Sequence, residues 1–342
     1  MRTDEQLLAD TADKTFRQCA EGPQAWRLIE ELGLTRIGIA EELGGSGGDA
    51  EQARIVLRSA AYHAVALPLA ETLWLAAPLL ADARLPIPDG PLTVASAAIG
   101  QFRVRPNLSG SSWQLDGVLR RVPWARSASR IVVAADDRVC LVDPSDCRIT
   151  HGANLAGEPR DEVYLDGVTV DADDLGSLPY RVDLRERGAL ARSVQIGGAA
   201  QRALDHSLEY ATQRVQFGRP IAAFQAVQQY LAQMAGEVAA ANLSVASAVH
   251  KTAGRPNGAH LVATARVNAC RAAGIVAELA HQVHGAIGTT REHDLRLATT
   301  RLWSWREEFG GEAEWARVLG DKASADGDPW HLVTRYEAPY TA

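Results

Sequence analysis

The stretch RVQFGRPIAAFQ, residues 214–225, interrupts two long helical patterns and contains residue types that a simple helix hairpin does not need. A turn between helices needs a glycine such as Gly218 to free the backbone, and a proline such as Pro220 suits the first position of the next helix. It does not need Arg214, Gln225 or the phenylalanines between them. This composition indicates that the break does more than reverse the chain.

Helical patterns surround this stretch on both sides. Long amphipathic patterns precede and follow it, an alanine-rich helix comes next, and residues 289–311 begin a fourth. Four long helices joined by short breaks predict a C-terminal four-helix bundle over residues 180–322. Residues 323–342 are predicted to form a poorly packed tail.

The chain changes character twice before this bundle. Residues 1–84 show helical patterns, whereas residues 85–179 show short alternating or β-branched runs between turns rich in glycine, aspartate and asparagine. We therefore expect an N-terminal helical domain followed by a small antiparallel β domain. The predicted fold class is mainly α with a central β domain.

Composition disfavours several classes of protein. The 342 residues carry a formal net charge of −7, which disfavours a nucleic-acid partner because phosphate binding requires a basic face. No stretch approaches the ~20 apolar residues of a membrane span, and the N-terminus lacks an apolar signal core. The cysteines are scattered without CxxC spacing, which disfavours disulfide frameworks and zinc sites and predicts a cytoplasmic protein: they are Cys19, Cys140, Cys147 and Cys270.

The order of helices, β domain and bundle, together with RVQFGRPIAAFQ, resembles the acyl-CoA dehydrogenase family of flavoproteins. QVHGAIGTTREHDL, residues 282–295, is similar to a motif near the end of the family's bundle, and IAEELGGSGG, residues 39–48, is similar to an N-terminal turn of the family. The resemblance implies the family's three-part fold and FAD-dependent α,β-dehydrogenation of an acyl-CoA thioester. It also implies that electrons pass to an electron-transfer flavoprotein.

The resemblance assigns residues to the cofactor. In the family the hairpin stretch holds the FAD of a neighbouring subunit, so Arg214 would pair with the pyrophosphate and Gln225 would hydrogen-bond a base edge or the ribose. The backbone of residues 282–286 would approach the adenine, which Gly285 permits. The FAD-binding residues expected on this basis are Arg214, Gln216, Phe217, Phe224, Gln225, Gln282, Val283, His284, Gly285 and Ala286.

The family reaction also requires a carboxylate that takes the α-proton. In many members this base follows the adenine motif, in a region that here reads SWREEFGGE. A one-residue shift places Glu308 at the base position, so Glu308 is our candidate and Glu307 the alternative. A solvated helix end at these glutamates is an open alternative. A second subgroup carries its base earlier, where this chain has Gly188 and, close by, Glu186.

The β domain departs from the family pattern. Our alignment places Arg121 and Pro123 where the family has a flavin-contacting tryptophan and a hydroxyl residue, and proline has no N–H to donate. Trp124 could still cover the flavin ring. The sequence therefore keeps the residues expected to contact the adenine half of FAD, whereas those expected to contact the isoalloxazine ring are replaced.

This asymmetry leaves alternative interpretations open. The chain is either an acyl-CoA dehydrogenase that carries its own base, or a non-catalytic subunit that clamps FAD in a heteromeric dehydrogenase. Its length and eroded β domain resemble the short family members of sterol catabolism, which pair with a fuller-length partner. A flavin-dependent monooxygenase of the same fold is a third alternative. We expect a dimer or tetramer of like or unlike chains, and the sequence leaves the acyl group open.

Overall fold

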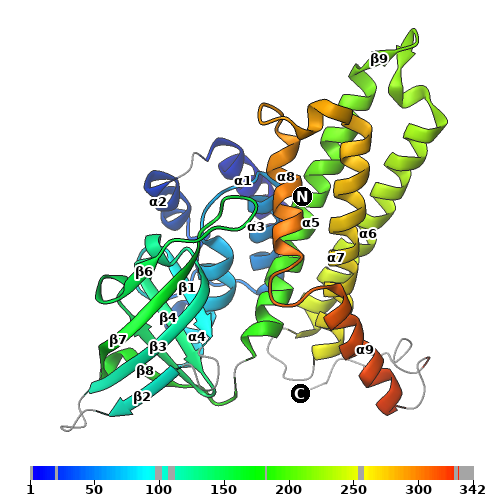
Figure 1. Ribbon diagram of the computed structural model, residues 1–342. Coiled ribbons are helices and arrows are strands. Elements are labelled where there is room, and N and C mark those ends of the chain that lie inside the picture. Colours follow the sequence, from blue (N-terminus) through cyan, green and yellow to red (C-terminus); the bar gives the residue numbers. More distant parts are fainter. Residues whose placement is uncertain are drawn as a thin grey trace.

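Helices at both ends of the sequence flank a central set of strands (Figure 1). The computed structural model describes residues 3–19, 22–96, 102–106, 112–181, 183–252, 258–326 and 330. This order of elements confirms the predicted fold class.

The N-terminal part is helical and begins its main helices with side-chain caps. Thr3 and Asp49 each accept a hydrogen bond from a backbone N–H of the first turn. The side chains of Gln6 and Gln52 in turn accept one from the backbone N–H of Thr3 and Asp49. One segment, η2, is a π-helical stretch, a wider turn that places Glu71 in the interior. The elements are α1 (Asp4–Gln18), α2 (Pro23–Glu31), η1 (Glu41–Leu43), α3 (Ala50–Tyr62), η2 (Ala70–Ala76) and α4 (Ala77–Asp82).

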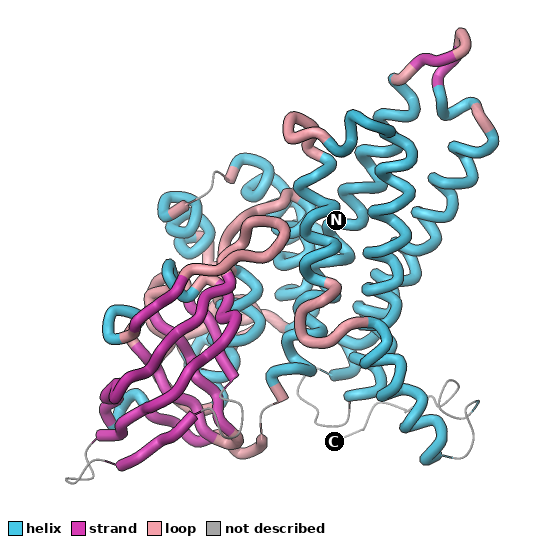
Figure 2. Tube along the Cα trace, in the orientation of Figure 1, coloured by secondary structure: helices cyan, strands magenta, loops and turns pink. Residues whose placement is uncertain are grey.

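The strands form two packed four-stranded sheets, shown in magenta in Figure 2. One sheet has the order β1-β4-β5-β8 and the other β2-β3-β7-β6. The prediction of an antiparallel domain is wrong for one pair, because β1 runs parallel to β4. The strands are β1 (Leu92–Ser96), β2 (Phe102–Pro106), β3 (Ser112–Pro123), β4 (Arg130–Ala135), β5 (Arg138–Val142), β6 (Arg148–Thr150), β7 (Arg160–Asp171) and β8 (Leu175–Ser177).

The C-terminal bundle is built from three long helices and two shorter ones (Figure 1). The expected fourth long helix is divided into α8 and α9, and α9 continues into the segment predicted as a tail. The elements are α5 (Leu184–Gln213), β9 (Val215–Gln216), β10 (Arg219–Pro220), η6 (Ile221–Ala223), α6 (Gln225–Thr252), α7 (Ala259–His284), η7 (Gly285–Thr289), α8 (Leu295–Trp305) and α9 (Glu312–Asp326). Most of the predicted tail lies outside the described residues.

Shared hydrophobic cores join the three parts. Phe16 and Leu57 of the N-terminal helices belong to the same core as Ala189 and Val262 of the bundle. A second core packs η2 and α4 against the sheet that contains β1. The bundle, the N-terminal helices and the two sheets therefore form successive layers. Among the described helices, none combines the length and the apolar composition that a membrane span requires.

Candidate cofactor clamp and buried ion-pair network

Residues 214–225 form an exposed hairpin at one end of the bundle (Figure 1). Strands β9 and β10 pair antiparallel, and the turn between them places Phe217 and Gly218 at φ values of 52° and 78°. Glycine adopts this conformation freely, whereas phenylalanine does so only with strain. The prediction for Pro220 is wrong: it lies in β10, and η6 separates it from the start of α6 at Gln225.

The side chains of this hairpin face solvent. Phe217 is 93% exposed, and within the described part of the chain no hydrogen bond or ion pair holds the side chain of Arg214 or Gln225. The Phe217 and Phe224 rings meet edge to face with centroids 6.0 Å apart, and the Arg219 guanidinium lies 4.3 Å from the Phe224 centroid. The hairpin thus presents two cations and two aromatic rings to an external molecule. Arg219 was not singled out from the sequence.

The second predicted FAD stretch, residues 282–286, is divided between surface and core. Gln282, Gly285 and Ala286 line an open groove of about 850 Å³ that runs along α7. A Cβ at Gly285, where φ is 63°, would meet no atom within 4 Å, so the backbone there is open to a ligand. Val283 and His284 are instead 7% and 4% exposed and point into the bundle.

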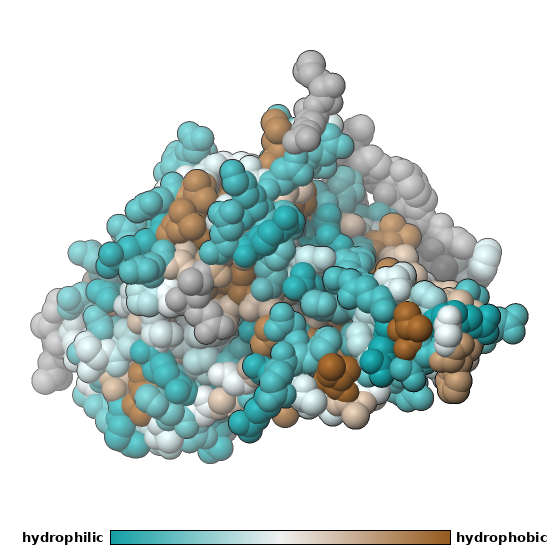
Figure 3. All heavy atoms as spheres, turned by 90° about the horizontal axis from the view of Figure 1, so that it is seen from above, coloured by the Kyte–Doolittle hydropathy of each residue, from teal (hydrophilic) through white to brown (hydrophobic). Residues whose placement is uncertain are grey.

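Exposed apolar side chains at this end are scattered. Figure 3 looks down on this end of the molecule and shows brown, hydrophobic groups separated by teal, hydrophilic ones. Val215, Phe217 and Ile287 are among the exposed large apolar residues. This surface therefore suits an amphipathic, charged ligand rather than a continuous apolar partner face.

The residues present fit one half of FAD and not the other. Uncommitted Arg214 and the open backbone at Gly285 suit a pyrophosphate and an adenine. On the β side, Pro123 is buried without an N–H, and its carbonyl already accepts a hydrogen bond from the Thr93 hydroxyl. Arg121 is exposed at a φ of 54°. This chain therefore offers neither a hydroxyl nor an N–H donor at position 123 for a flavin ring.

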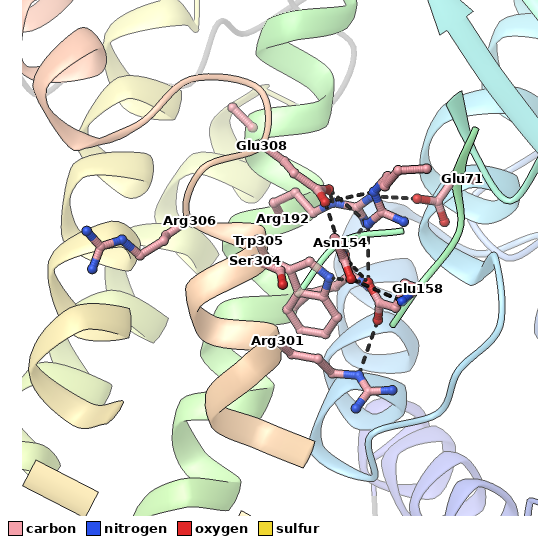
Figure 4. Close-up of polar contacts among 12 residues, drawn as sticks. Glu71, Asn154, Glu158, Arg192, Arg301, Ser304, Trp305, Arg306 and Glu308 are labelled. Carbon is pink, nitrogen blue, oxygen red and sulfur yellow. Dashed lines mark hydrogen bonds and ion pairs between the residues drawn. The ribbon is translucent and has the colours of Figure 1, made fainter. Parts of the chain in front are cut away.

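Glu308, the predicted base, lies at the centre of a buried ion-pair network (Figure 4). Arg160 donates to it from Nε at 2.8 Å and from Nη2 at 3.0 Å, and Arg192 donates from Nε at 2.7 Å. Asn154 adds a fourth hydrogen bond at 3.3 Å. Burial alone would raise the pKa of Glu308, but the two guanidinium groups outweigh it and hold the pKa at about 2.

This geometry argues against both glutamates as the base. A general base works best with a pKa near the operating pH and with a free lone pair toward the substrate. Glu308 has neither property, because both of its oxygens already accept hydrogen bonds from arginine. Glu307 points to solvent with 64% of its side chain exposed and pairs with Arg306. The contacts of Glu308 therefore favour an ion-pair role, and its assignment as the catalytic base stays a prediction.

The network extends through three parts of the molecule. Arg192 of α5 also pairs with Glu71 of η2 at 2.5 Å. Arg160 pairs with Glu158 at 3.2 Å, and Glu158 in turn receives Arg301 and the Trp305 indole N–H of α8. Three arginines balance three glutamates, all nearly inaccessible to water. The network therefore links the β domain, the N-terminal helices and the bundle without a net charge.

Arg266 of α7 fixes the turn that carries Glu308. Its guanidinium donates to the carbonyls of Trp305 at 2.8 Å, Arg306 at 3.1 Å and Gly310 at 3.1 Å, and also to the carbonyl of Glu308. Carbonyls at the end of α8 that lack helical partners are satisfied in this way. Sequence reasoning missed Arg160, Arg192 and Arg266; the signal available for Arg192 was an arginine within the apolar stretch ALARSVQIGG.

The other family position for a base is filled by an aromatic ring. A Cβ at Gly188 would lie 2.4 Å from atoms of the Phe309 ring, so no side chain fits there. Phe309 reaches this place through a φ of 58°, next to Gly310 at 94°. Nearby Glu186 lines a separate cavity of about 790 Å³, and burial raises its pKa. In the described structure, position 188 thus has no room for a side chain, and the carboxylate of Glu308 is engaged by arginines.

Gly188→Ala is expected to lower the free energy of unfolding by about 1–3 kcal/mol through overpacking against Phe309. Alanine would otherwise favour a helix interior by about 1 kcal/mol over glycine. Gly236→Ala in α6 is the matched control, because a Cβ there meets no atom within 4 Å. Denaturant midpoints of the two variants check this expectation. Equal stabilisation by both substitutions would contradict the packing of Phe309 on Gly188.

Comparisons with known proteins agree with this fold. Residues 185–317 match the C-terminal domain of acyl-CoA dehydrogenases. The chain is 32% identical to "Acyl-CoA dehydrogenase IpdE2" of Mycobacterium tuberculosis over 283 residues, which cover 80% of this chain and 78% of that protein.

Solved structures show the same architecture. The ChsE4-ChsE5 complex of Mycobacterium tuberculosis superposes with a TM-score of 0.82 at 26% identity, over 95% of this chain and 98% of the matched chain. Butyryl-CoA dehydrogenase of Megasphaera elsdenii gives a TM-score of 0.83 at 20% identity, over 95% and 99% of the two chains.

Proposed function

The chain belongs to the acyl-CoA dehydrogenase family, and on that premise we propose that it acts in FAD-dependent α,β-dehydrogenation of an acyl-CoA thioester as the subunit that clamps the cofactor. In this proposal a partner chain supplies the catalytic base. The observation that carries it is the engagement of Glu308 by two buried arginines while Arg214 and Gln225 remain exposed and uncommitted.

In this proposal the hairpin and the groove bind different parts of FAD. Arg214, Gln216, Phe217, Phe224 and Gln225 of the hairpin would hold the pyrophosphate and neighbouring rings. Gln282 and Gly285 would border the adenine, with Ala286 beside them in the same groove. When bound, FAD supplies the acceptor for the hydride that leaves Cβ of the substrate. We extend the proposal to an electron-transfer flavoprotein as electron acceptor, on the family resemblance alone.

A two-chain assembly supports this division of labour. The related structure at 26% identity is the ChsE4-ChsE5 complex. A heteromer removes the need for every chain to carry both a base and a complete flavin pocket. A dehydrogenase that works with its own Glu308 is the less favoured alternative, because that carboxylate would first have to lose two arginine partners.

Assembly state and flavin content test the proposal. Purified alone, this chain is expected to lack both a full flavin complement and dehydrogenation of acyl-CoA. Combined with a fuller-length family member from the same source, it should form a complex well above its own 36.7 kDa that retains FAD. Solution mass and the flavin absorbance spectrum measure both properties. A homo-oligomer of this chain with one FAD per chain and full turnover would overturn the clamping role.

A further inference from the structure

A cluster of rings from Tyr210, His284 and His293, here called the aromatic joint, lies inside the bundle between the hairpin and the groove. The hairpin and the groove are the two halves of the candidate clamp. The ring of Tyr210 on α5 stacks on His284 at the end of α7, with centroids 4.5 Å apart and planes 22° apart. His293, which precedes α8, packs edge-on against His284 at 4.9 Å and approaches His206 at 6.3 Å. Three segments of the bundle end therefore meet at His284.

Each member of the stack lies directly beside one half of the clamp. The Tyr210 carbonyl accepts the backbone N–H of Arg214 at 2.8 Å, so the last turn of α5 carries the hairpin. His284 immediately precedes Gly285, which borders the groove. Movement of one ring against the other would consequently change the separation between the hairpin and the groove.

Hydrogen bonds fix the protonation form that this packing requires. Nδ1 of His284 donates to the Ala280 carbonyl at 2.8 Å, so the neutral ring has its lone pair on Nε2. That nitrogen is buried and has no partner among the described residues, and neither has Nε2 of His206. Nδ1 of His293 accepts the Leu295 N–H at 3.1 Å. A second proton on His284 would have no acceptor within the described structure.

The charges around the joint do not compensate such a proton. Burial and the neighbouring histidines lower the pKa of His284 to about 4, and burial with Arg202 lowers the pKa of His206. The acidic groups Asp294 and Glu209 raise the pKa of His206, but burial and Arg202 outweigh them. The titratable and charged groups that face the cluster are Arg202, His206 and Glu209 of α5, His281 of α7, and His293 and Asp294 before α8.

We propose that Tyr210 and His284, supported by His293, are positioning residues that hold the hairpin and the groove at the separation FAD requires, and that they do so only while His284 is neutral. This inference rests on the proposed function, because it takes FAD as the ligand of both surfaces. Acidification would then change the separation between the hairpin and the groove and weaken FAD binding, without change at any residue that touches the cofactor.

Substitutions at His284 separate stacking from titration. His284→Ala removes the stacked ring and is expected to weaken FAD binding by the assembled protein about two- to tenfold, the range expected for a lost aromatic pair. His284→Phe keeps an aromatic ring and cannot be protonated, so its affinity at pH 7.5 should be within about twofold of wild type. Tyr210→Leu tests the stack from its other side and should weaken binding as His284→Ala does. Flavin fluorescence titration measures all three.

The pH profile tests the requirement for a neutral ring. A histidine whose pKa is lower in the fold than its usual 6.5 stabilises the protein fully above pH 6.5 and progressively less as the pH falls toward 4. Wild-type affinity and melting temperature should therefore fall in that window, and those of His284→Phe should fall less. His250→Ala, at an exposed histidine near the far end of α6, should follow wild type.

The outcomes distinguish a failure of the aromatic joint from a failure of the proposed FAD-clamping function. Full affinity in His284→Ala and Tyr210→Leu would overturn the joint while leaving the clamp intact. If no assembly containing this chain binds FAD at pH 7.5, the proposed function fails. The joint is then judged from melting temperature alone, and parallel pH profiles of wild type and His284→Phe would overturn it.

Discussion

Glu308→Gln lowers the free energy of unfolding by about 3–5 kcal/mol in our expectation, the cost of removing one partner from a buried ion pair. Glutamine keeps the size of the side chain but leaves Arg160 and Arg192 facing a neutral amide in a site that is 8% exposed. Glu307→Gln is the matched control on the neighbouring residue. Its side chain is 64% exposed, so its change should stay within about 0.5 kcal/mol. Urea denaturation of both variants measures the difference.

The pH dependence of the free energy of unfolding should also report on Glu308. The folded pKa of Glu308, about 2, lies below its usual 4.5, so its stabilising contribution is complete above pH 4.5 and is lost as the pH falls toward 2. This window lies below that of the histidine joint except between pH 4 and 4.5, where the two overlap. Glu308→Gln should flatten the stability profile there. A variant as stable as wild type, in an assembly whose dehydrogenation has collapsed, would restore Glu308 as the base.

Arg214→Ala is expected to weaken FAD binding by the assembled protein tenfold or more. A charge-assisted hydrogen bond to phosphate contributes about 1.5–3 kcal/mol, and every 1.4 kcal/mol corresponds to about a factor of ten. The fold should not change, because Arg214 is exposed and its side chain has no partner among the described residues. Fluorescence titration with FAD gives the affinity, and circular dichroism checks the fold.

Arg120→Ala provides the matched control for this measurement. Arg120 lies on β3, far from the hairpin in the sequence, and 66% of its side chain is exposed. Losing a charge there should leave FAD affinity within about twofold of wild type, because exposed charges act weakly at a distance in salt. Equal affinities of the Arg214 and Arg120 variants would remove the hairpin from the cofactor site.

Local patterns predicted the architecture because helix and strand periods are local properties. The change from helical to alternating patterns near residues 85 and 180 is visible in the sequence alone, and so is the glycine turn at Gly218. The parallel pairing of β1 with β4 was not predictable in this way, because strands distant in sequence pair according to the packing of the whole sheet. Local turn chemistry also could not show that η6 intervenes between Pro220 and α6.

The ion-pair partners of Glu308 escaped prediction for the same physical reason. Its two arginine partners lie 148 and 116 residues away in the sequence, so the local cluster WREEF shows a carboxylate without its counter-charges. Likewise, His284 was grouped with the cofactor residues because it stands inside the adenine motif. Its ring turns inward, which only the packing of α5 against α7 decides.

The balanced charges of the Arg–Glu network make the Glu308 carboxylate difficult to free by single mutations. Freeing Glu308 for proton transfer would require the loss of both Arg160 and Arg192, and the intermediate variants would each strand a buried charge. Removing Arg192 would also leave Glu71 without its ion pair, and removing Arg160 would leave Glu158 with Arg301 as its remaining ion-pair partner among the described residues. Because each such step costs several kcal/mol in a protein whose total stability is about 5–15 kcal/mol, single substitutions in this network would destabilise the fold before they released the Glu308 carboxylate.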